Sequence, residues 1–490
     1  MSIANLGLSP FYKTKTDSMK DEYKYKRLFK DTLLFALGNI GSKIIIFFLV
    51  PFYTYYLSPE EYGISDLVFT VSQLAIPFFS LVIFDAVIRF ALARKENPQD
   101  VLLVGFLVWA CGSLLAVIMT PLLGFYKAIS EWKWYTVAYV SANMLVSIEL
   151  NYLKAVDRNL LYSIICILET LSLACLNILL VAHYRMGIQG YLISYVGSNV
   201  IAAVFAFVFG KLLRELRTAR FESVIAKQMI TYSSPLILNN LSWWVIQSSD
   251  KLMLEEMVSE TALGIYTVAS RIPSLITVFI TIFQQAWGIS SIKEMDSSND
   301  KKYYSNVFTY YSLIAFLAGI GLCTIIKPFM GIYVRSNAYG EVWQYVPLLL
   351  ASAVFSALAA YCGSMYGALK KSTNNMYTTV VAAVVNVIVN YVTILLFGLW
   401  GAMIGTITAY TTLAFVRIID VRRFVDISIE WKKLIGNSVL LLAQSIFVSV
   451  VEYRIGIVLS ICTLGVFLLL NQTELTQIIR FIIIRRKKHV

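Results

Sequence analysis

The feature that most constrains this chain is a series of apolar segments, each long enough to cross a bilayer. A spanning helix needs about 20 mainly apolar residues, and fourteen such segments follow one another along the 490 residues. They lie at residues 31–57, 63–91, 101–124, 134–153, 160–182, 188–210, 229–254, 262–289, 304–330, 344–369, 376–397, 399–419, 434–451 and 455–471. The short connections leave no room for a separate soluble domain. The pattern predicts an all-α polytopic membrane protein.

Composition excludes a protein that folds in water. Hydrophobic residues make up 58% of the chain and charged residues 14%, whereas a soluble protein is about half apolar and about a quarter charged. A soluble enzyme is therefore excluded, and the net charge of +12 points to membrane orientation rather than to nucleic acid. Two histidines and six cysteines without a CxxC pair predict neither a metal site nor a disulfide framework. We expect no cofactor and no catalytic residues.

The distribution of Lys and Arg predicts the orientation of the spans. With the N-terminus in the cytosol, 31 of the 41 Lys and Arg residues fall in cytosolic segments, seven in outer segments and three inside spans. Cytosolic loops of membrane proteins carry such an excess of positive charge. The polar first 30 residues lack the apolar core of a cleaved signal peptide. We expect a multi-pass membrane protein with both termini in the cytosol.

Two pairs of short motifs predict two related halves. Residues 58–64 read SPEEYGI and residues 259–265 read SETALGI, each after the first span of a six-span block. Gly187-Ile-Gln-Gly190 and Gly398-Leu-Trp-Gly401 precede the sixth and twelfth spans. Two units that both start in the cytosol form a parallel repeat, with the substrate site between the halves. The expected parts are a basic tail (1–30), an N-terminal six-helix bundle (31–213), a cytosolic linker (214–228), a C-terminal six-helix bundle (229–424), an extra helix pair (432–471) and a second basic tail (472–490).

Ionisable side chains at membrane depth give the sharpest functional signal, because they are costly there and usually face a cavity or a partner. Three are cations that we predict to bind substrate in a central cavity: Lys43, Arg89 and Arg271. Four are carboxylates that we predict to be partners of these cations or ion-coupling sites: Asp85, Glu149, Glu169 and Asp250.

The role of the cations depends on whether they are paired. Lys43 and Arg271 have no carboxylate nearby on their own helices, and they come from different halves. An anionic ligand explains such cations best, since arginine binds phosphate bidentately and lysine acts as a point charge. The alternative is that they pair with Glu149 or Glu169 across helices and only hold the bundle together. Asp85 and Arg89, four residues apart, could pair along their own helix.

An ordered set of motifs runs through nearly the whole chain. In the first half these are Phe35-Ala-Leu-Gly-Asn-Ile-Gly-Ser-Lys43, Val50-Pro-Phe-Tyr53, Leu57-Ser-Pro-Glu-Glu-Tyr-Gly63 and Asp85-Ala-Val-Ile-Arg-Phe90. In the second half they are Ser234-Pro-Leu-Ile-Leu-Asn-Asn240, Ser249-Asp-Lys251 and Gly264-Ile-Tyr-Thr-Val-Ala-Ser-Arg-Ile-Pro273. With this set the chain resembles the polysaccharide (Wzx-type) flippases of the multidrug/oligosaccharidyl-lipid/polysaccharide exporter superfamily.

The resemblance implies a V-shaped pair of six-helix bundles around a central cavity. It implies transport, by alternating access, of an undecaprenyl-diphosphate-linked oligosaccharide for capsule or O-antigen from the inner to the outer leaflet. It also places the protein in the bacterial cytoplasmic membrane. The predicted partners are this glycolipid, membrane lipid, polysaccharide polymerase machinery and, because acidic residues inside spans often carry ions, H⁺ or Na⁺ as a coupling ion. Two other functions stay open: a drug/cation antiporter of the same fold, which would need a dominant acidic site, and a membrane glycan polymerase or ligase.

Overall fold

The computed structural model of the protein describes residues 45–93, 96–281, 283, 284, 287, 301–369 and 371–477, which are nearly all helical. The helices of the first half are Ile45–Tyr56, α2 (Pro59–Ser80), α3 (Ile83–Ala93), α4 (Pro98–Ile118), α5 (Thr120–Leu123), α6 (Lys127–Ser130), α7 (Lys133–Ala155), α8 (Asn159–Asn177), a π-helical turn (Ile178–His183), α9 (Gly187–Phe209) and α10 (Leu212–Thr218). Those that follow are α11 (Ser223–Met257), α12 (Glu260–Arg271), Ser274–Thr281, α14 (Lys301–Tyr333), α15 (Val346–Ala368), α16 (Ser372–Phe397), α17 (Leu399–Val421), α18 (Trp431–Val450) and α19 (Tyr453–Leu470).

The helices occur in the order that the hydropathy pattern predicts. Among the described residues, nine helices are long and apolar enough to cross a membrane, or ten if α12 and Ser274–Thr281 count as one bent span. Adding α7, α11 and the two shorter apolar helices, Ile45–Tyr56 and Arg454–Leu470, gives the predicted series of fourteen. The protein is therefore a multi-pass membrane protein.

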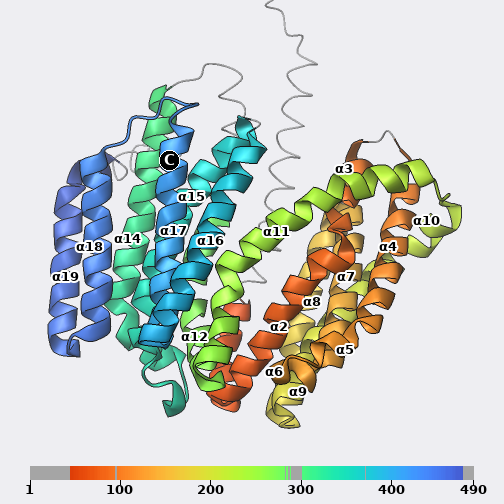
Figure 1. The fold of residues 1–490 in the computed structure, drawn as a ribbon, viewed down its shortest axis with the longest axis horizontal. Helices are drawn as coiled ribbons and strands as arrows, with labels where there is room; N and C mark the ends of the chain where they lie inside the picture. Colours follow the sequence, from red (N-terminus) through yellow and green to blue (C-terminus); the bar gives the residue numbers. More distant parts are fainter. Residues whose placement is uncertain are drawn as a thin grey trace, which may run out of the picture.

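Figure 1 shows two groups of helices that meet at one end and diverge toward the other. The N-terminal lobe comprises α2–α10, and the C-terminal lobe comprises α12 and α14–α19. The long helix α11 begins beside α10 and runs obliquely to the end where the lobes meet, and α18 and α19 form the outermost pair of the C-terminal lobe. This confirms the predicted V-shaped, all-α fold with an extra C-terminal helix pair.

The two copies of the first repeated motif pack against each other where the lobes meet. Ser58 and Ser259 cap α2 and α12, since each hydroxyl accepts a hydrogen bond from the backbone N–H three residues on. A Cβ on Gly63 would lie 2.7 Å from the Glu260 carbonyl oxygen, and one on Gly264 would overlap the Pro59 carbonyl group. Each half therefore presents its glycine to the first turn of the other half's helix, a reciprocal contact that requires glycine on both sides.

The second repeated motif also begins with a glycine of positive φ in both halves. Gly187 and Gly398 have φ of 54° and 55°, a left-handed conformation that glycine adopts without steric cost. The second glycine of each motif, Gly190 or Gly401, then packs on the backbone of the preceding helical segment. The shared geometry shows that the two glycine motifs are equivalent elements of the repeat.

The predicted span 63–91 is interrupted in the structure. The first part, α2, ends at Ser80, and α3 starts at Ile83 after Leu81 and Val82, which have φ of 51° and 52°. The Val82 backbone N–H donates to the Ser80 hydroxyl at 3.0 Å, which replaces a helical hydrogen bond. The segment predicted as a linker, 214–228, includes part of α10 and the first turns of α11.

Candidate functional site

A cluster of three charged side chains joins the lobes near the end where they meet. Asp66 on α2 is only 1% exposed, and its two oxygens lie 2.6 Å from Lys251 Nζ on α11 and 2.6 Å from Arg271 Nη2 on α12. Thr267 Oγ1 also donates to Asp66, at 3.2 Å. Because two cations share one carboxylate, this cluster, hereafter the interlobe cluster, carries one surplus positive charge.

Arg271 is therefore paired, with a partner that neither sequence-based alternative named. Its side chain is 24% exposed, and its Nε is buried without a hydrogen-bond partner. The guanidinium also lies within electrostatic range of Tyr62, Tyr191 and Tyr195. The rings of Tyr191 and Tyr195 are 4.8 Å apart, and those of Tyr62 and Tyr191 are 6.2 Å apart. Arg271 thus connects a cluster of tyrosines in the N-terminal lobe to the C-terminal lobe.

Of the three predicted cations, the structure describes Arg89 and Arg271, and it places them on different helices away from each other. Lys43 lies outside the described residues. Arg89 is exposed on α3, away from the interlobe cluster on α2, α11 and α12. Asp85, on the same helix as Arg89, is half-buried, and these two described side chains form no ion pair.

The other predicted carboxylates occupy different environments. Glu149 on α7 is completely buried, and neither of its carboxylate oxygens has a hydrogen-bond partner. Glu169 on α8 is half-buried near Tyr139. Asp250 on α11 is 1% exposed and accepts hydrogen bonds from the Tyr266 hydroxyl and from Thr406 Oγ1, the latter at 3.0 Å. The Asp250 carboxylate thus accepts hydrogen bonds from residues of the C-terminal lobe, whereas the Glu149 carboxylate has no hydrogen-bond partner.

Asp66 and Lys251 are not among the site residues predicted from the sequence. The repeat contains a signal that could have found Asp66. Asp66 is eight residues after Ser58, and Thr267 is eight residues after Ser259. Since the two motifs pack reciprocally, residues at the same offset meet near the axis between the halves, as Thr267 and Asp66 do.

A further buried cation, Arg417 on α17, was assigned by sequence to a cytosolic segment. It is 1% exposed, and its guanidinium donates only to neutral acceptors: Thr378 Oγ1, the Ala359 carbonyl, Asn375 and Thr379 Oγ1. It also lies over the ring of Trp243 on α11, 5.7 Å from the centroid. Arg417 therefore connects α11, α15, α16 and α17 without a carboxylate among its described contacts.

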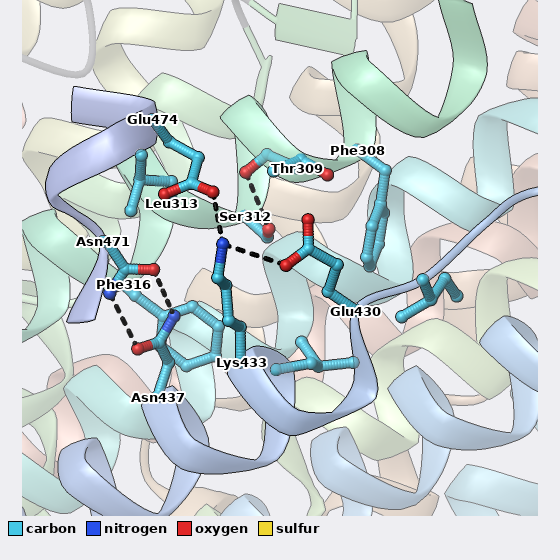
Figure 2. Close-up of a pocket in the computed structure, with 12 residues that line it drawn as sticks. Phe308, Thr309, Ser312, Leu313, Phe316, Glu430, Lys433, Asn437, Asn471 and Glu474 are labelled. Carbon is cyan, nitrogen blue, oxygen red and sulfur yellow. Dashed lines mark hydrogen bonds and ion pairs between the residues drawn. The ribbon is translucent and has the colours of Figure 1, made fainter. Parts of the chain in front are cut away.

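A polar pocket also lies between α14, α18 and the residues after α19 (Figure 2). Lys433 Nζ lies 2.9 Å from Glu430 and also pairs with Glu474, while Asn437 and Asn471 exchange two amide hydrogen bonds of 3.2 and 3.0 Å. Burial raises the pKa of Glu474, but hydrogen bonds from Lys433 and Thr473 outweigh it and hold the pKa below its usual value. The mutual pairing of these groups indicates that they stabilise the packing of α18 against the end of α19.

Comparisons with known proteins identify the family of this chain. The family model described as polysaccharide biosynthesis protein matches residues 28–288, and the MatE model matches residues 235–392. The chain is 22% identical over 268 residues to Lsg locus putative protein 1 of Haemophilus influenzae, a match that covers 53% of this chain and 65% of that protein. It is 22% identical over 261 residues to the probable low-salt glycan biosynthesis flippase Agl15 of Haloferax volcanii, covering 50% of this chain and 54% of Agl15. These matches span less than two thirds of each relative.

Solved structures agree with this assignment at the level of the fold. The lipid II flippase MurJ in an inward closed conformation superposes with a TM-score of 0.66 at 12% identity, covering 90% of this chain and all of MurJ. An inward-facing multidrug resistance MATE family transporter superposes with a TM-score of 0.65 at 16% identity, covering 80% of this chain and 94% of the transporter. The resemblance predicted from the motifs is confirmed at the level of the family: the chain belongs to the polysaccharide biosynthesis protein family, and its fold is that of a solved transporter of the multidrug/oligosaccharidyl-lipid/polysaccharide exporter superfamily.

Proposed function

We propose that the protein is a flippase that moves an undecaprenyl-diphosphate-linked oligosaccharide repeat unit, for capsule or O-antigen, across the cytoplasmic membrane by alternating access. A diphosphate head group cannot cross about 30 Å of hydrocarbon unaided. A transporter would have to supply a polar path with positive charge for the head group while the lipid tail stays in the bilayer.

The observation that carries the proposal is the interlobe cluster. Lys251 and Arg271 share the single carboxylate of Asp66, so this cluster has one more cation than anion, and an anionic head group would neutralise the excess. The Arg271 side chain is 24% exposed, so part of it is accessible. Since arginine binds phosphate bidentately, Arg271 would exchange its contact with Asp66 for one with the diphosphate as the lobes separate.

The charge distribution supports an orientation for this state. The end of α3, the start of α4, α10 and the start of α11 lie at the end where the lobes diverge (Figure 1), and the sequence assigns the segments around them to the cytosol by their Lys and Arg content. We therefore assign the diverging end to the cytosol, and both termini with it. In this assignment the interlobe cluster closes the outer side, and the protein is ready to receive substrate from the inner leaflet.

A drug/cation antiporter remains the second candidate, because Glu149 is a fully buried carboxyl whose oxygens have no hydrogen-bond partner. Such a group can hold and release a coupling ion, as can Glu169 or Asp250 in the flippase, with H⁺ or Na⁺ as the ion. A glycan polymerase or ligase is disfavoured, since the named relatives are flippases and transporters rather than enzymes. Cooperation with polysaccharide polymerase machinery belongs to the same proposal.

Reconstitution into proteoliposomes tests the proposal. The probe is lipid-linked oligosaccharide extracted from the producing cells, and a membrane-impermeant oxidant reports the glycan that reaches the outer leaflet. We expect the wild-type protein to increase the accessible fraction without changing glycan length, and Arg271→Ala or Lys43→Ala to abolish the increase at equal protein level. Growth of the glycan would instead establish an enzyme, and ion-driven efflux of a cationic dye without glycolipid movement would establish the antiporter.

A further inference from the structure

A second cavity, of about 250 Å³, lies within the C-terminal lobe between α11, the bent α12 segment, α15 and α17. Gln247, Ser274 and Thr277 are exposed at its rim, whereas Ser352 and Thr406 are buried in its wall at 4% and 6% exposure. The rim makes the cavity accessible, and the buried hydroxyl groups give it a polar interior. None of the residues predicted from the sequence as binding sites lines it.

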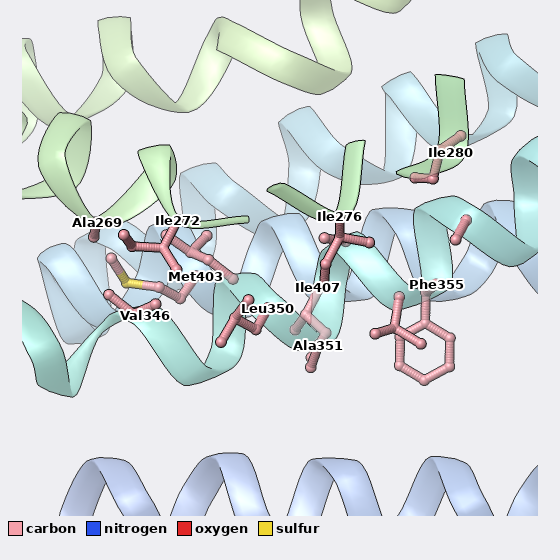
Figure 3. Close-up of a cluster of buried hydrophobic side chains, with 14 of the residues drawn as sticks. Ala269, Ile272, Ile276, Ile280, Val346, Leu350, Ala351, Phe355, Met403 and Ile407 are labelled. Carbon is pink, nitrogen blue, oxygen red and sulfur yellow. The ribbon is translucent and has the colours of Figure 1, made fainter. Parts of the chain in front are cut away.

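The cavity is formed by a break in one membrane helix. Proline has no N–H to continue a helix, and at Pro273 the axis turns by 40° between Glu260–Arg271 and Ser274–Thr281. One face of this segment is anchored, because Ala269, Ile272, Ile276 and Ile280 pack against Val346, Leu350, Met403 and Ile407 (Figure 3). The other face turns Ser270, Ser274 and Thr277 into the cavity. Transporters build substrate sites from such discontinuous helices.

The hydroxyl groups that line the cavity are arranged to accept hydrogen bonds. Ser270 Oγ donates to the Thr267 carbonyl at 2.8 Å, Ser352 Oγ donates to the Leu349 carbonyl at 2.7 Å, and Ser274 Oγ donates to the Arg271 carbonyl. A hydroxyl has one donor and two acceptor lone pairs, so each of these groups retains acceptor capacity for a ligand. Gln247 adds an amide that both donates and accepts. A ligand rich in O–H and N–H donors matches this lining.

The low charge of the lining indicates a neutral ligand rather than a phosphate. Of the described residues that line the cavity, only Lys251 is charged, and its Nζ is 2.6 Å from Asp66. Arg271 lies between Ser270 and Pro273 in the chain, but its guanidinium bonds to Asp66 at the contact between the lobes. A neutral polyhydroxylated group therefore suits the cavity, while a diphosphate suits the adjoining interlobe cluster.

We propose that this cavity is the glycan subsite of the transporter, and that it binds one sugar ring of the lipid-linked oligosaccharide. The inference rests on the proposed flippase function. Pockets for drug-sized ligands measure roughly 300–1,000 Å³, so 250 Å³ accommodates a single ring rather than a whole repeat unit. The ring adjacent to the diphosphate enters the cavity, because Ser270 and Arg271 are neighbours in the chain.

The test compares two lipids on the full-length protein in nanodiscs: lipid-linked oligosaccharide extracted from the producing cells, and undecaprenyl diphosphate without sugar. Thr277→Val removes a rim hydroxyl, and Ser356→Leu fills part of the cavity. We expect each to weaken binding of the glycolipid by about 3- to 10-fold, the effect of one or two lost hydrogen bonds, and to leave undecaprenyl diphosphate binding unchanged. Retained binding of the sugar-free lipid shows that the variants are folded.

The matched control variants change residues of α15 and α17 that do not line the cavity. Thr408→Val removes a half-buried hydroxyl of α17 that donates to the Ile404 carbonyl, and Ser364→Leu enlarges a half-buried side chain of α15. Both should bind the glycolipid as the wild type does. Equal glycolipid affinity in the wild type and in both cavity variants would overturn the subsite while leaving the flippase intact. Wild-type protein that binds neither lipid would overturn the proposed function and the subsite with it.

Discussion

At the scale of single residues, the unusual group is Asp66, one buried carboxylate that serves two cations. Removing its charge while keeping its shape leaves Lys251 and Arg271, which are 15% and 24% exposed, facing each other without compensation. Loss of one member of a largely buried ion pair is strongly destabilising. We expect Asp66→Asn to lower the free energy of unfolding by about 3 kcal/mol, measured as a fall in the melting temperature in detergent.

Lys251→Met is the matched variant, because it removes the surplus cation and leaves the Asp66–Arg271 pair intact. It should change the melting temperature little. If Lys251→Met were as destabilising as Asp66→Asn, the surplus charge assigned to the cluster would be wrong.

Arg417 allows a second prediction at this scale. Its guanidinium donates to acceptors from α15 and α16 while it is 1% exposed, so Arg417→Met removes hydrogen bonds from a charged donor, which contribute about 1.5–3 kcal/mol each. Arg423, 73% exposed and 3.6 Å from Asp420, is the control, since surface ion pairs contribute about 0–1 kcal/mol. Thermal unfolding should separate the two variants clearly, and equal melting temperatures would contradict a structural role for Arg417.

The sequence identified costly charges but not their partners. Arg271 is a predicted site residue because a cation inside a span usually faces a ligand or a partner, and in the structure it has a carboxylate partner. Its partner Asp66 lies 205 residues away in the chain, and pairing across lobes depends on how helices face one another, which hydropathy does not encode. Arg417 was assigned to a loop because it lies near the end of an apolar run, where the sequence cannot distinguish a snorkelling arginine from a buried one.

At the scale of helices, the lobes approach closely only because glycine occupies two crossing points. A methyl group on Gly264 would overlap the backbone carbonyl of Pro59, and backbone cannot move aside as a flexible side chain can. We expect Gly264→Ala to separate the N-terminal ends of α2 and α12. The measurement is cross-linking by a short bismaleimide between cysteines at Glu60 and Thr261, whose side chains are 3.4 Å apart, in a background without the six native cysteines.

The control is Gly331→Ala on α14, where an added Cβ meets nothing within 4 Å. It should leave the cross-linking yield unchanged, whereas Gly264→Ala should reduce it several-fold. An unchanged yield in Gly264→Ala would mean that the helices do not depend on this crossing.

Helix positions were predictable because a bilayer requires about 20 apolar residues per span. The interruption at Leu81–Val82 was not, since neither residue is glycine or proline and both have positive φ, a conformation that β-branched residues such as valine rarely adopt. The capping hydrogen bond from Val82 N–H to Ser80 depends on tertiary placement. Local propensity therefore gives no warning of this break.

At the scale of the whole molecule, the repeat predicted two lobes, and the structure adds how they meet. Both glycine motifs keep their conformation in each half, so symmetry could be predicted from the sequence. The sequence could not predict which end of the V is closed, because one repeated sequence is compatible with contact at either end. The closed end is defined by long-range contacts such as Tyr339 Oη to the Leu57 carbonyl at 3.2 Å and Tyr333 Oη to the Phe47 carbonyl at 2.7 Å.

The proposed alternating-access mechanism requires that this closed end open during each cycle, which gives a prediction for the whole protein. The Glu60→Cys/Thr261→Cys pair, joined by a bismaleimide with a reducible spacer, holds α2 against α12 and should abolish glycolipid translocation. Reduction of the spacer should restore it. Either single-cysteine variant, treated identically, should transport normally, because no link forms. Full transport by the cross-linked double variant would show that the contact between Gly63 and Gly264 stays closed throughout the cycle, and the substrate would then have to leave by another route.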